Sequence, residues 1–224
     1  MGLVFRLLGF FALVGPILAG DITGHAVITK HLTKKTLSPV TYNLRGLPPP
    51  SAAETDRVNE FDRMVVMLEG GSEHSNPPIT AVLDQRNIRF DPDLIVIPVG
   101  STVEFPNSDP IFHNVFSLSR VQPFDLGFYP RGQSRSVKFN RPGIVQVYCH
   151  IHANMYAAIV VASTPWYAKP ASDGSFGWRD VPPGHYRLLA WHKIAGLHSI
   201  PVDVPATGAV DFTIRVPIDG EPRP

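Results

Sequence analysis

The chain has 224 residues, a formal net charge of +1 and 17% charged side chains. A chain of this length can bury one good core or two small ones. It contains no block of basic residues, which argues against nucleic acid and anionic membranes as partners. Its 23 prolines and 18 glycines suit short strands and turns better than long helices. We therefore expect a folded, mostly β protein.

The first 20 residues have the features of an export signal. Arg6 is the only charged residue before the apolar run 7–19, and polar sequence begins at Asp21. This run is shorter than the roughly 20 residues that span a bilayer. We expect a signal peptide (residues 1–20) and a periplasmic or secreted mature chain without a membrane span. Its removal takes Arg6 away and leaves 19 basic and 19 acidic side chains. The alternative is a retained anchor helix.

Short strands separated by turn signals follow in chain order. Residues 22–29 alternate in polarity, and residues 64–68 (MVVML) form an unbroken apolar run. Alternation predicts a half-buried strand, and a short apolar run predicts a buried one. A helical turn is expected near 52–62. Further strands are expected at residues 81–83, 94–99, 102–105, 113–118, 134–139, 144–149 and 156–162. Strands at this spacing predict a β-sandwich or a barrel.

The pattern of turns changes after Ser163. Residues 173–176 (DGSF) and 181–188 (VPPGHYRL) resemble the DGxF…PPGxYxL pattern of carboxypeptidase-regulatory or transthyretin-like sandwiches. Residues 24–27 and 64–70 fit the first half of that pattern. The resemblance implies a split domain, in which residues 21–70 plus 164–218 form a small carboxypeptidase-regulatory-like β-sandwich around an inserted domain, residues 79–163. The alternative is an unstructured N-terminal arm with extra strands on a single sandwich.

Cys149 is the only cysteine in the chain. Exported proteins usually hold cysteines in pairs, so an unpaired one is either a buried apolar residue or a committed ligand. His152 and Met155 follow Cys149 at intervals of three residues, and His113 precedes it by 36. Two imidazoles, one thiolate and a weak thioether suit a copper electron-transfer site. A single cysteine argues against structural zinc, disulfide exchange and haem attachment.

The surrounding motifs extend this pattern. They read FPNSD at 105–109, HNVFS at 113–117, Pro-Gly at 142–143 and YCHIHANM at 148–155. This set resembles the cupredoxins, or blue copper proteins, and the resemblance covers about 85 residues. It is most similar to amicyanin and the plastocyanin-like proteins labelled methylamine utilisation proteins.

The resemblance implies an all-β fold, a cupredoxin Greek-key β-sandwich that holds one type 1 copper ion. It implies His113, Cys149, His152 and Met155 as the copper ligands, and Asn114 as a residue that ties the two ligand loops together by a hydrogen bond. The implied function is one-electron transfer through His152 at an apolar patch, without catalysis. The implied partner is a redox protein such as a c-type cytochrome or a quinoprotein dehydrogenase.

Two features of the ligand loop depart from the family pattern or add to it. Ala153 stands where the amicyanin-like loop often has proline, which leaves the reduction potential and any protonation of reduced-state His152 open. Strand alternation points His150 away from Cys149, so we expect a surface or hydrogen-bonded role for it. The remaining histidines have no partner at ligand spacing and are expected to be surface or structural residues.

Three alternative functions are kept. The first is copper storage or delivery with the same ligands and no redox role. The second is a redox enzyme or gas-sensing site with an open copper position, which would require Met155 to be displaced. The third is a structural or adhesion protein, which leaves the pairing of Cys149 with the HxxM sequence unexplained.

Overall fold

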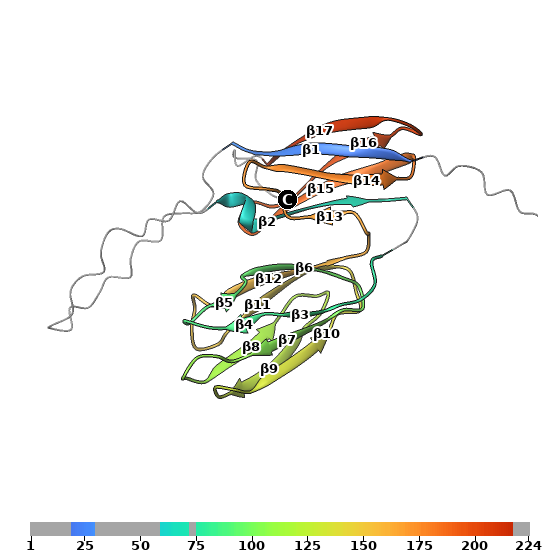
Figure 1. Ribbon diagram of the computed structural model, residues 1–224. Coiled ribbons are helices and arrows are strands. Elements are labelled where there is room, and N and C mark those ends of the chain that lie inside the picture. Colours follow the sequence, from blue (N-terminus) through green and yellow to red (C-terminus); the bar gives the residue numbers. More distant parts are fainter. Residues whose placement is uncertain (1–18, 30–58, 72–74, 217–224) are drawn as a thin grey trace, which may run out of the picture.

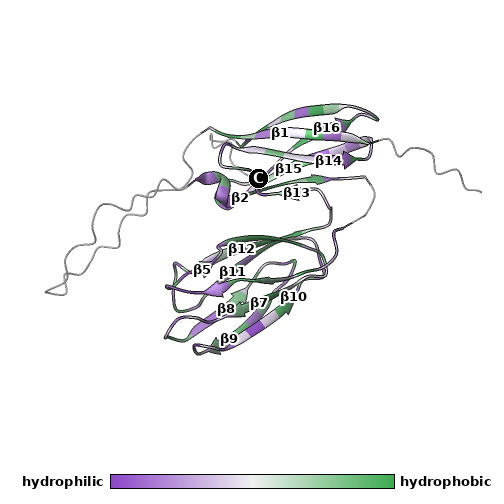
Figure 2. Cartoon of the chain, viewed as in Figure 1, coloured by the Kyte–Doolittle hydropathy of each residue, from purple (hydrophilic) through white to green (hydrophobic). Residues whose placement is uncertain are grey.

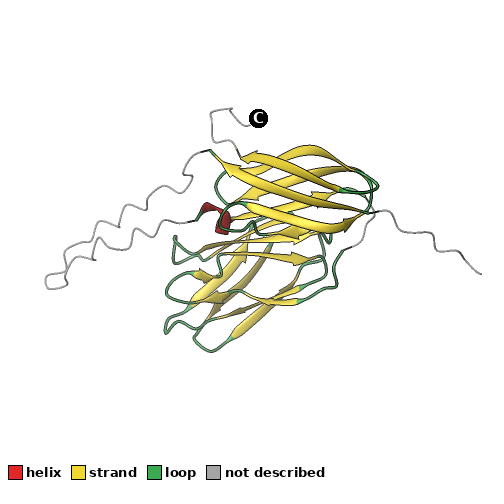
Figure 3. Ribbon diagram, turned by 45° about the horizontal axis from the view of Figure 1, so that its top comes forward, coloured by secondary structure: helices red, strands yellow, loops and turns green. Residues whose placement is uncertain are grey.

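The computed structural model describes residues 19–29, 59–71 and 75–216. Most of the expected signal peptide and of the helical turn near 52–62 lies outside these residues. Strands dominate the described part, and its one helix is the short 3₁₀ turn η1 (Glu60–Arg63) (Figure 3). None of the described residues forms a helix long and apolar enough to cross a bilayer. The chain is all-β, as predicted.

Two sheets form the outer sandwich, which includes the first and last described strands (Figure 1). One sheet has the order β14-β1-β17, with β1 at Gly20–Ile28, β14 at Ser175–Val181 and β17 at Ala209–Val216. The other has the order β13-β2-β15-β16, with β2 at Met64–Glu69, β13 at Tyr167–Ala168, β15 at Gly184–His192 and β16 at Gly196–Val204. Apolar side chains including Ile22, Val66, Leu188 and Ile214 are buried between them.

The inserted sandwich holds the strands between these two parts of the chain. One sheet has the order β10-β7-β3, with β3 at Thr80–Val82, β7 at Thr102–Pro106 and β10 at Ser134–Lys138. The other has the order β6-β12-β11-β8-β9, with β6 at Leu94–Pro98, β8 at His113–Ser117, β9 at Phe124–Tyr129, β11 at Gly143–Tyr148 and β12 at Tyr156–Ala162. A short hairpin, β4 (Asp84–Gln85) and β5 (Phe90–Asp91), precedes β6.

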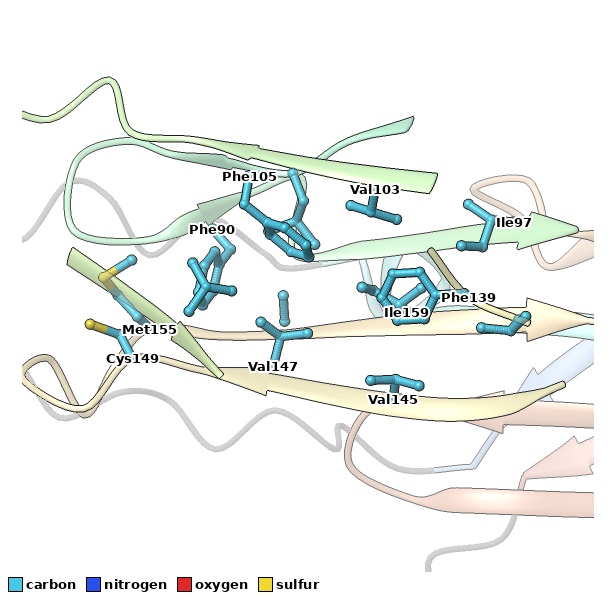
Figure 4. Close-up of a cluster of buried hydrophobic side chains, with 14 of the residues drawn as sticks. Phe90, Ile97, Val103, Phe105, Phe139, Val145, Val147, Cys149, Met155 and Ile159 are labelled. Carbon is cyan, nitrogen blue, oxygen red and sulfur yellow. The ribbon is translucent and has the colours of Figure 1, made fainter. Parts of the chain in front are cut away.

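The core of the inserted sandwich lies between its two sheets. Phe105, Phe139 and Ile159 are fully buried there (Figure 4). Cys149 and Met155 belong to the same cluster, and Figure 4 shows their sulfur atoms at one end of it. The candidate ligands therefore extend from a packed core, which restricts their movement.

The two sandwiches pack against each other through β12 and its neighbours. Alternate residues of β12 face opposite ways: Ile159 joins the core of the inserted sandwich, whereas Val160 contacts a cluster that includes Val65 and Trp191 of the outer one. β12 is hydrophobic along most of its length (Figure 2), because both of its faces are covered. The Lys193 ammonium adds an ion pair across the contact, 2.6 Å from a carboxylate oxygen of Asp93.

All nine strands expected between residues 22 and 162 overlap an observed strand. The strands of 20–69 and 167–216 share one sandwich, and those of 80–162 form the other. The division into a split domain and an inserted domain stays a prediction. Independent folding of the inserted part, and the family of the outer sandwich, stay predictions.

Candidate metal centre

Strand pairing brings the predicted ligands to one end of the inserted sandwich. His113 begins β8, and Cys149 directly follows β11. These strands are antiparallel, with Phe116 opposite Tyr148, so His113 lies level with the loop that follows Cys149. A turn in that loop, closed by a 2.9 Å hydrogen bond from the Met155 amide to the His152 carbonyl, returns the chain to β12. The site is therefore assembled from two neighbouring strands and one short loop.

Three of the four predicted ligands lie within reach of one small ion. One ligand atom from each of His113, Cys149 and His152 lies within 4.8 Å of the others. The two Nδ1 atoms are 3.1 Å apart, and the Cys149 Sγ is 3.8 Å from the His152 Nδ1. Cys149 is a free thiol with 6% of its surface exposed, and Met155 beside it in the core is 1% exposed.

This arrangement fits a soft metal ion. Two imidazole nitrogens that face each other at 3.1 Å cannot both carry a proton on the facing side. When a cation lies between them, both nitrogens can bind it through their lone pairs. A thiolate next to such a pair completes the donor set that proteins use for copper. The residues present therefore fit the implied cofactor.

The loop before β8 positions His113 through a contact at its Nε2. Asn107 is buried, and its side-chain amide donates to the carbonyls of Ile111 and Tyr129 at 2.9 and 3.0 Å. Its Oδ1 accepts the amide hydrogen of Asp109. The Asp109 carboxylate in turn lies 2.8 Å from the Nε2 of His113, on the opposite side of the ring from Cys149 and His152.

Two further hydrogen bonds act on the Asp109 carboxylate, which accepts the backbone N–H groups of Asn87 and Ile88 at 2.6 and 2.8 Å. Burial raises the pKa of this carboxyl, but the hydrogen bonds from Ile88, His113 and Asn87 outweigh burial, so its pKa lies below the usual value. Asp109 is therefore held as a carboxylate beside the His113 ring.

Asn114 makes a different contact from the one that the resemblance implied. Its side-chain amide donates at 2.7 Å to Asp125 on β9, and no hydrogen bond joins its side chain to the described loop 149–155. β9 is the strand paired with β8 at this position, and a carboxylate is a stronger acceptor than a neutral group. Asn114 thus ties β8 to β9 and leaves its own buried Oδ1 without a partner among the described residues.

His150 points away from the ligands, as strand alternation predicted. Its ring stacks on Phe116 with centroids 3.8 Å apart, and its Nε2 lies 3.6 Å from a carboxylate oxygen of Asp125. Nearly half of its side chain is exposed. It is not part of the group that surrounds Cys149.

Exposed apolar side chains flank the ligands in sequence. Ile111 and Phe112 precede His113 and are 40% and 57% exposed, and Ile151 precedes His152 and is 52% exposed. His152 is itself partly exposed, whereas His113 is fully buried. His152 is thus the imidazole that an approaching molecule can reach.

Comparison with solved structures finds partial matches to copper proteins. A copper-containing nitrite reductase from Thermus scotoductus matches with 25% identity over 42% of this chain and a TM-score of 0.36, and the match spans about a quarter (24%) of that enzyme. A purple cupredoxin from Nitrosopumilus maritimus matches with 23% identity over 37% of this chain and 99% of its own, with a TM-score of 0.34. An amicyanin from Paracoccus versutus matches with 20% identity over 43% of this chain and 98% of its own, with a TM-score of 0.35.

No protein-family model and no curated protein matches the sequence. At these TM-scores, the structural matches add no argument about function.

Sequence reasoning assigned no role to Asp109, although it belongs to the FxNxD motif. The signal that could have found it is a carboxylate four residues before a candidate ligand, His113. Gln85 and Tyr129 were also missed. Both are fully buried behind the motif, where the Gln85 side chain donates to the Tyr129 hydroxyl, and that hydroxyl donates to the carbonyl of Phe105.

Proposed function

We propose that the chain is an exported one-electron carrier that holds a single type 1 copper ion. The proposed ligands are His113, Cys149 and His152, with Met155 as the weak axial ligand. The observation that supports this most strongly is the approach of two Nδ1 atoms and a free, buried thiol within 4.8 Å. When bound, copper supplies a Cu(II)/Cu(I) couple at this position.

The chain holds the proposed ligand atoms in fixed positions. His113 is fixed on β8 and Cys149 at the end of β11, and both side chains belong to the buried interior. Their burial excludes water from that side of the site. A packed framework keeps the ligand atoms in one compromise arrangement, which is not ideal for either Cu(II) or Cu(I). The ligand atoms therefore move little when an electron is gained or lost.

Burial of Met155 supports a carrier over an enzyme. With 1% of its surface exposed and its sulfur at the same end of the core as that of Cys149 (Figure 4), it blocks the approach of a substrate from the core side. An enzyme or gas-sensing site needs an open coordination position, and this arrangement provides none from the interior.

The partly exposed His152 is the proposed point of electron exit and entry. Ile151, Phe112 and Ile111 provide exposed apolar surface beside the ligands, which suits brief contacts with another redox protein. A c-type cytochrome or a quinoprotein dehydrogenase is the proposed class of partner. Such an encounter is consistent with a periplasmic or extracellular location.

Redox cycling tests the proposal. The full mature chain, loaded with one equivalent of copper(II), is reduced with ascorbate and reoxidised with ferricyanide in the presence of a copper chelator. A carrier keeps its copper and recovers its absorption over many cycles. Rapid loss of copper to the chelator in the reduced state would favour storage or delivery instead.

A further inference from the structure

The loop behind His113 adds a residue that the ligand pattern does not include. The Asp109 carboxylate oxygen lies 2.8 Å from the His113 Nε2 in a buried setting. A neutral imidazole carries its proton on one nitrogen only. A carboxylate beside Nε2 keeps that proton on Nε2, so the lone pair is on Nδ1.

The Nδ1 of His113 is the atom that faces the proposed site. It lies 3.1 Å from the Nδ1 of His152. If the His113 Nδ1 carries the lone pair, it accepts a hydrogen bond, and the His152 Nδ1 must donate it when no cation is present. The contact with Asp109 therefore explains how one ring is prepared to bind a metal before the metal arrives.

A hairpin turn supplies two backbone donors to this carboxylate. Asn87 and Ile88 have φ values of 55° and 56°, in the left-handed region that a β-branched residue such as isoleucine rarely adopts. This conformation directs two successive N–H groups at Asp109. Both residues are the central pair of the exposed two-residue turn between β4 and β5, which is closed by backbone hydrogen bonds between Arg86 and Arg89 and favours a positive φ at both positions. The turn thus supplies two donors that hold the carboxylate in place.

We propose that Asp109 is a positioning residue for the copper site, an inference that rests on the proposed function. It fixes the His113 ring in the Nε2–H tautomer and makes Nδ1 a stronger donor. A negative charge behind the ring also favours the more highly charged Cu(II) over Cu(I). Partners of this kind commonly change metal affinity by about 10- to 100-fold.

The first test uses the copper-free chain and ¹⁵N NMR of the histidine rings. The wild-type protein is expected to show His113 as a single Nε2–H tautomer, and Asp109→Ala to show a mixture of tautomers. A single, unchanged tautomer in the variant would overturn the inference. This result does not depend on copper, so it remains informative even if the proposed function fails.

The second test compares copper-loaded Asp109→Asn with Asp84→Asn. Asp84→Asn is the matched control, because it also removes one negative charge close to Asp109. The Asp84 carboxylate accepts a hydrogen bond from Ser108, the neighbour of Asp109, and does not contact His113. Asp109→Asn is expected to shift the Cu(II)/Cu(I) equilibrium toward Cu(I) by about tenfold, which corresponds to about 59 mV for one electron. Asp84→Asn is expected to shift it much less.

Equal shifts in the two variants, or none in Asp109→Asn, would contradict a positioning role. Thermal unfolding of each copper-free variant shows whether it folds. If Asp109→Ala does not fold, the NMR comparison is made with Asp109→Asn, for which a weaker preference for the Nε2–H tautomer is expected. If wild-type protein takes up no copper, the proposed function fails, while the tautomer result stands separately.

Discussion

Each sandwich contains one fully buried histidine beside a buried carboxylate, and the two pairs differ in what the second ring nitrogen does. In the inserted sandwich, the His113 Nε2 is 2.8 Å from Asp109. In the outer one, the His192 Nε2 is 3.2 Å from Glu60. Both histidines are 0% exposed and both carboxylates are 8% exposed. Burial and a carboxylate partner therefore do not by themselves distinguish a functional histidine.

The Nδ1 atoms make the difference. The Nδ1 of His192 accepts the backbone N–H groups of Ile194 and Ala195 at 3.1 and 3.2 Å, which closes the turn between β15 and β16. The Nδ1 of His113 faces another imidazole and a thiol instead. One histidine is fully committed to holding the fold, whereas the other has a lone pair available to bind a metal ion.

Replacing each histidine by glutamine should separate the two roles most clearly. His113→Gln is expected to weaken copper(II) binding by about 100-fold or more, because it removes one of the strong ligands. His192→Gln is expected to leave binding within about threefold of the wild type, since it lies in the other sandwich. Competition titration with a copper chelator measures both. Similar losses in the two variants would break the comparison.

The same two variants should differ in the opposite direction in their free energy of unfolding, with the larger loss in His192→Gln. His192→Gln removes the acceptor of two backbone N–H groups and the partner of Glu60, and a buried unsatisfied group costs about 1–3 kcal/mol. We therefore expect a loss of about 2–4 kcal/mol in the free energy of unfolding of the copper-free chain. Urea denaturation monitored by circular dichroism measures it. A loss below about 1 kcal/mol would show that the turn does not depend on His192.

Stability should also depend on pH through His192. Burial lowers the pKa of this ring below its usual 6.5, and the nearby Glu60 only partly opposes the effect. The unfolded chain therefore binds a proton near pH 6.5 that the folded ring does not, so stability falls as pH decreases below about 6.5. Unfolding free energies measured between pH 7.5 and 5.5 should show this slope. The slope should shrink in His192→Gln, and an unchanged slope would assign it to other groups.

The smallest effects are expected at the surface. Ile151 is 52% exposed beside His152, and Leu197 is 55% exposed on β16. Serine at either position should change stability by about 0.5 kcal/mol or less and leave the copper absorption unchanged. Only Ile151→Ser should slow electron self-exchange, measured by NMR line broadening in mixtures of oxidised and reduced protein. Equal rates in both variants would remove the docking role proposed for Ile151.

The sequence predicted the parts of the structure that depend on local pattern. The unbroken apolar run 64–68 predicted a buried strand, and the structure places Val65 of β2 and Val160 of β12 at the contact between the sandwiches. The spacing of Cys149 and His152, with His113 upstream, indicated a cluster, and the structure brings these three together. Binding of copper by that cluster stays a prediction.

The features that were missed depend on tertiary contacts. β9 escaped prediction because Gly127, with φ of 65°, interrupts its pattern. The partner of Asn114 depends on which strand pairs with β8, and that strand is β9. The role of Asp109 arises from a loop closed by Asn107 and from N–H groups supplied by Asn87 and Ile88, more than twenty residues away in sequence.

The visible absorption spectrum of the copper(II)-loaded chain, compared with that of Cys149→Ser, tests the central claim most directly. An intense blue thiolate-to-copper band in the wild type that is absent in the variant is the predicted result. Bound copper without such a band, or a band that survives in Cys149→Ser, would contradict a type 1 copper site built on Cys149.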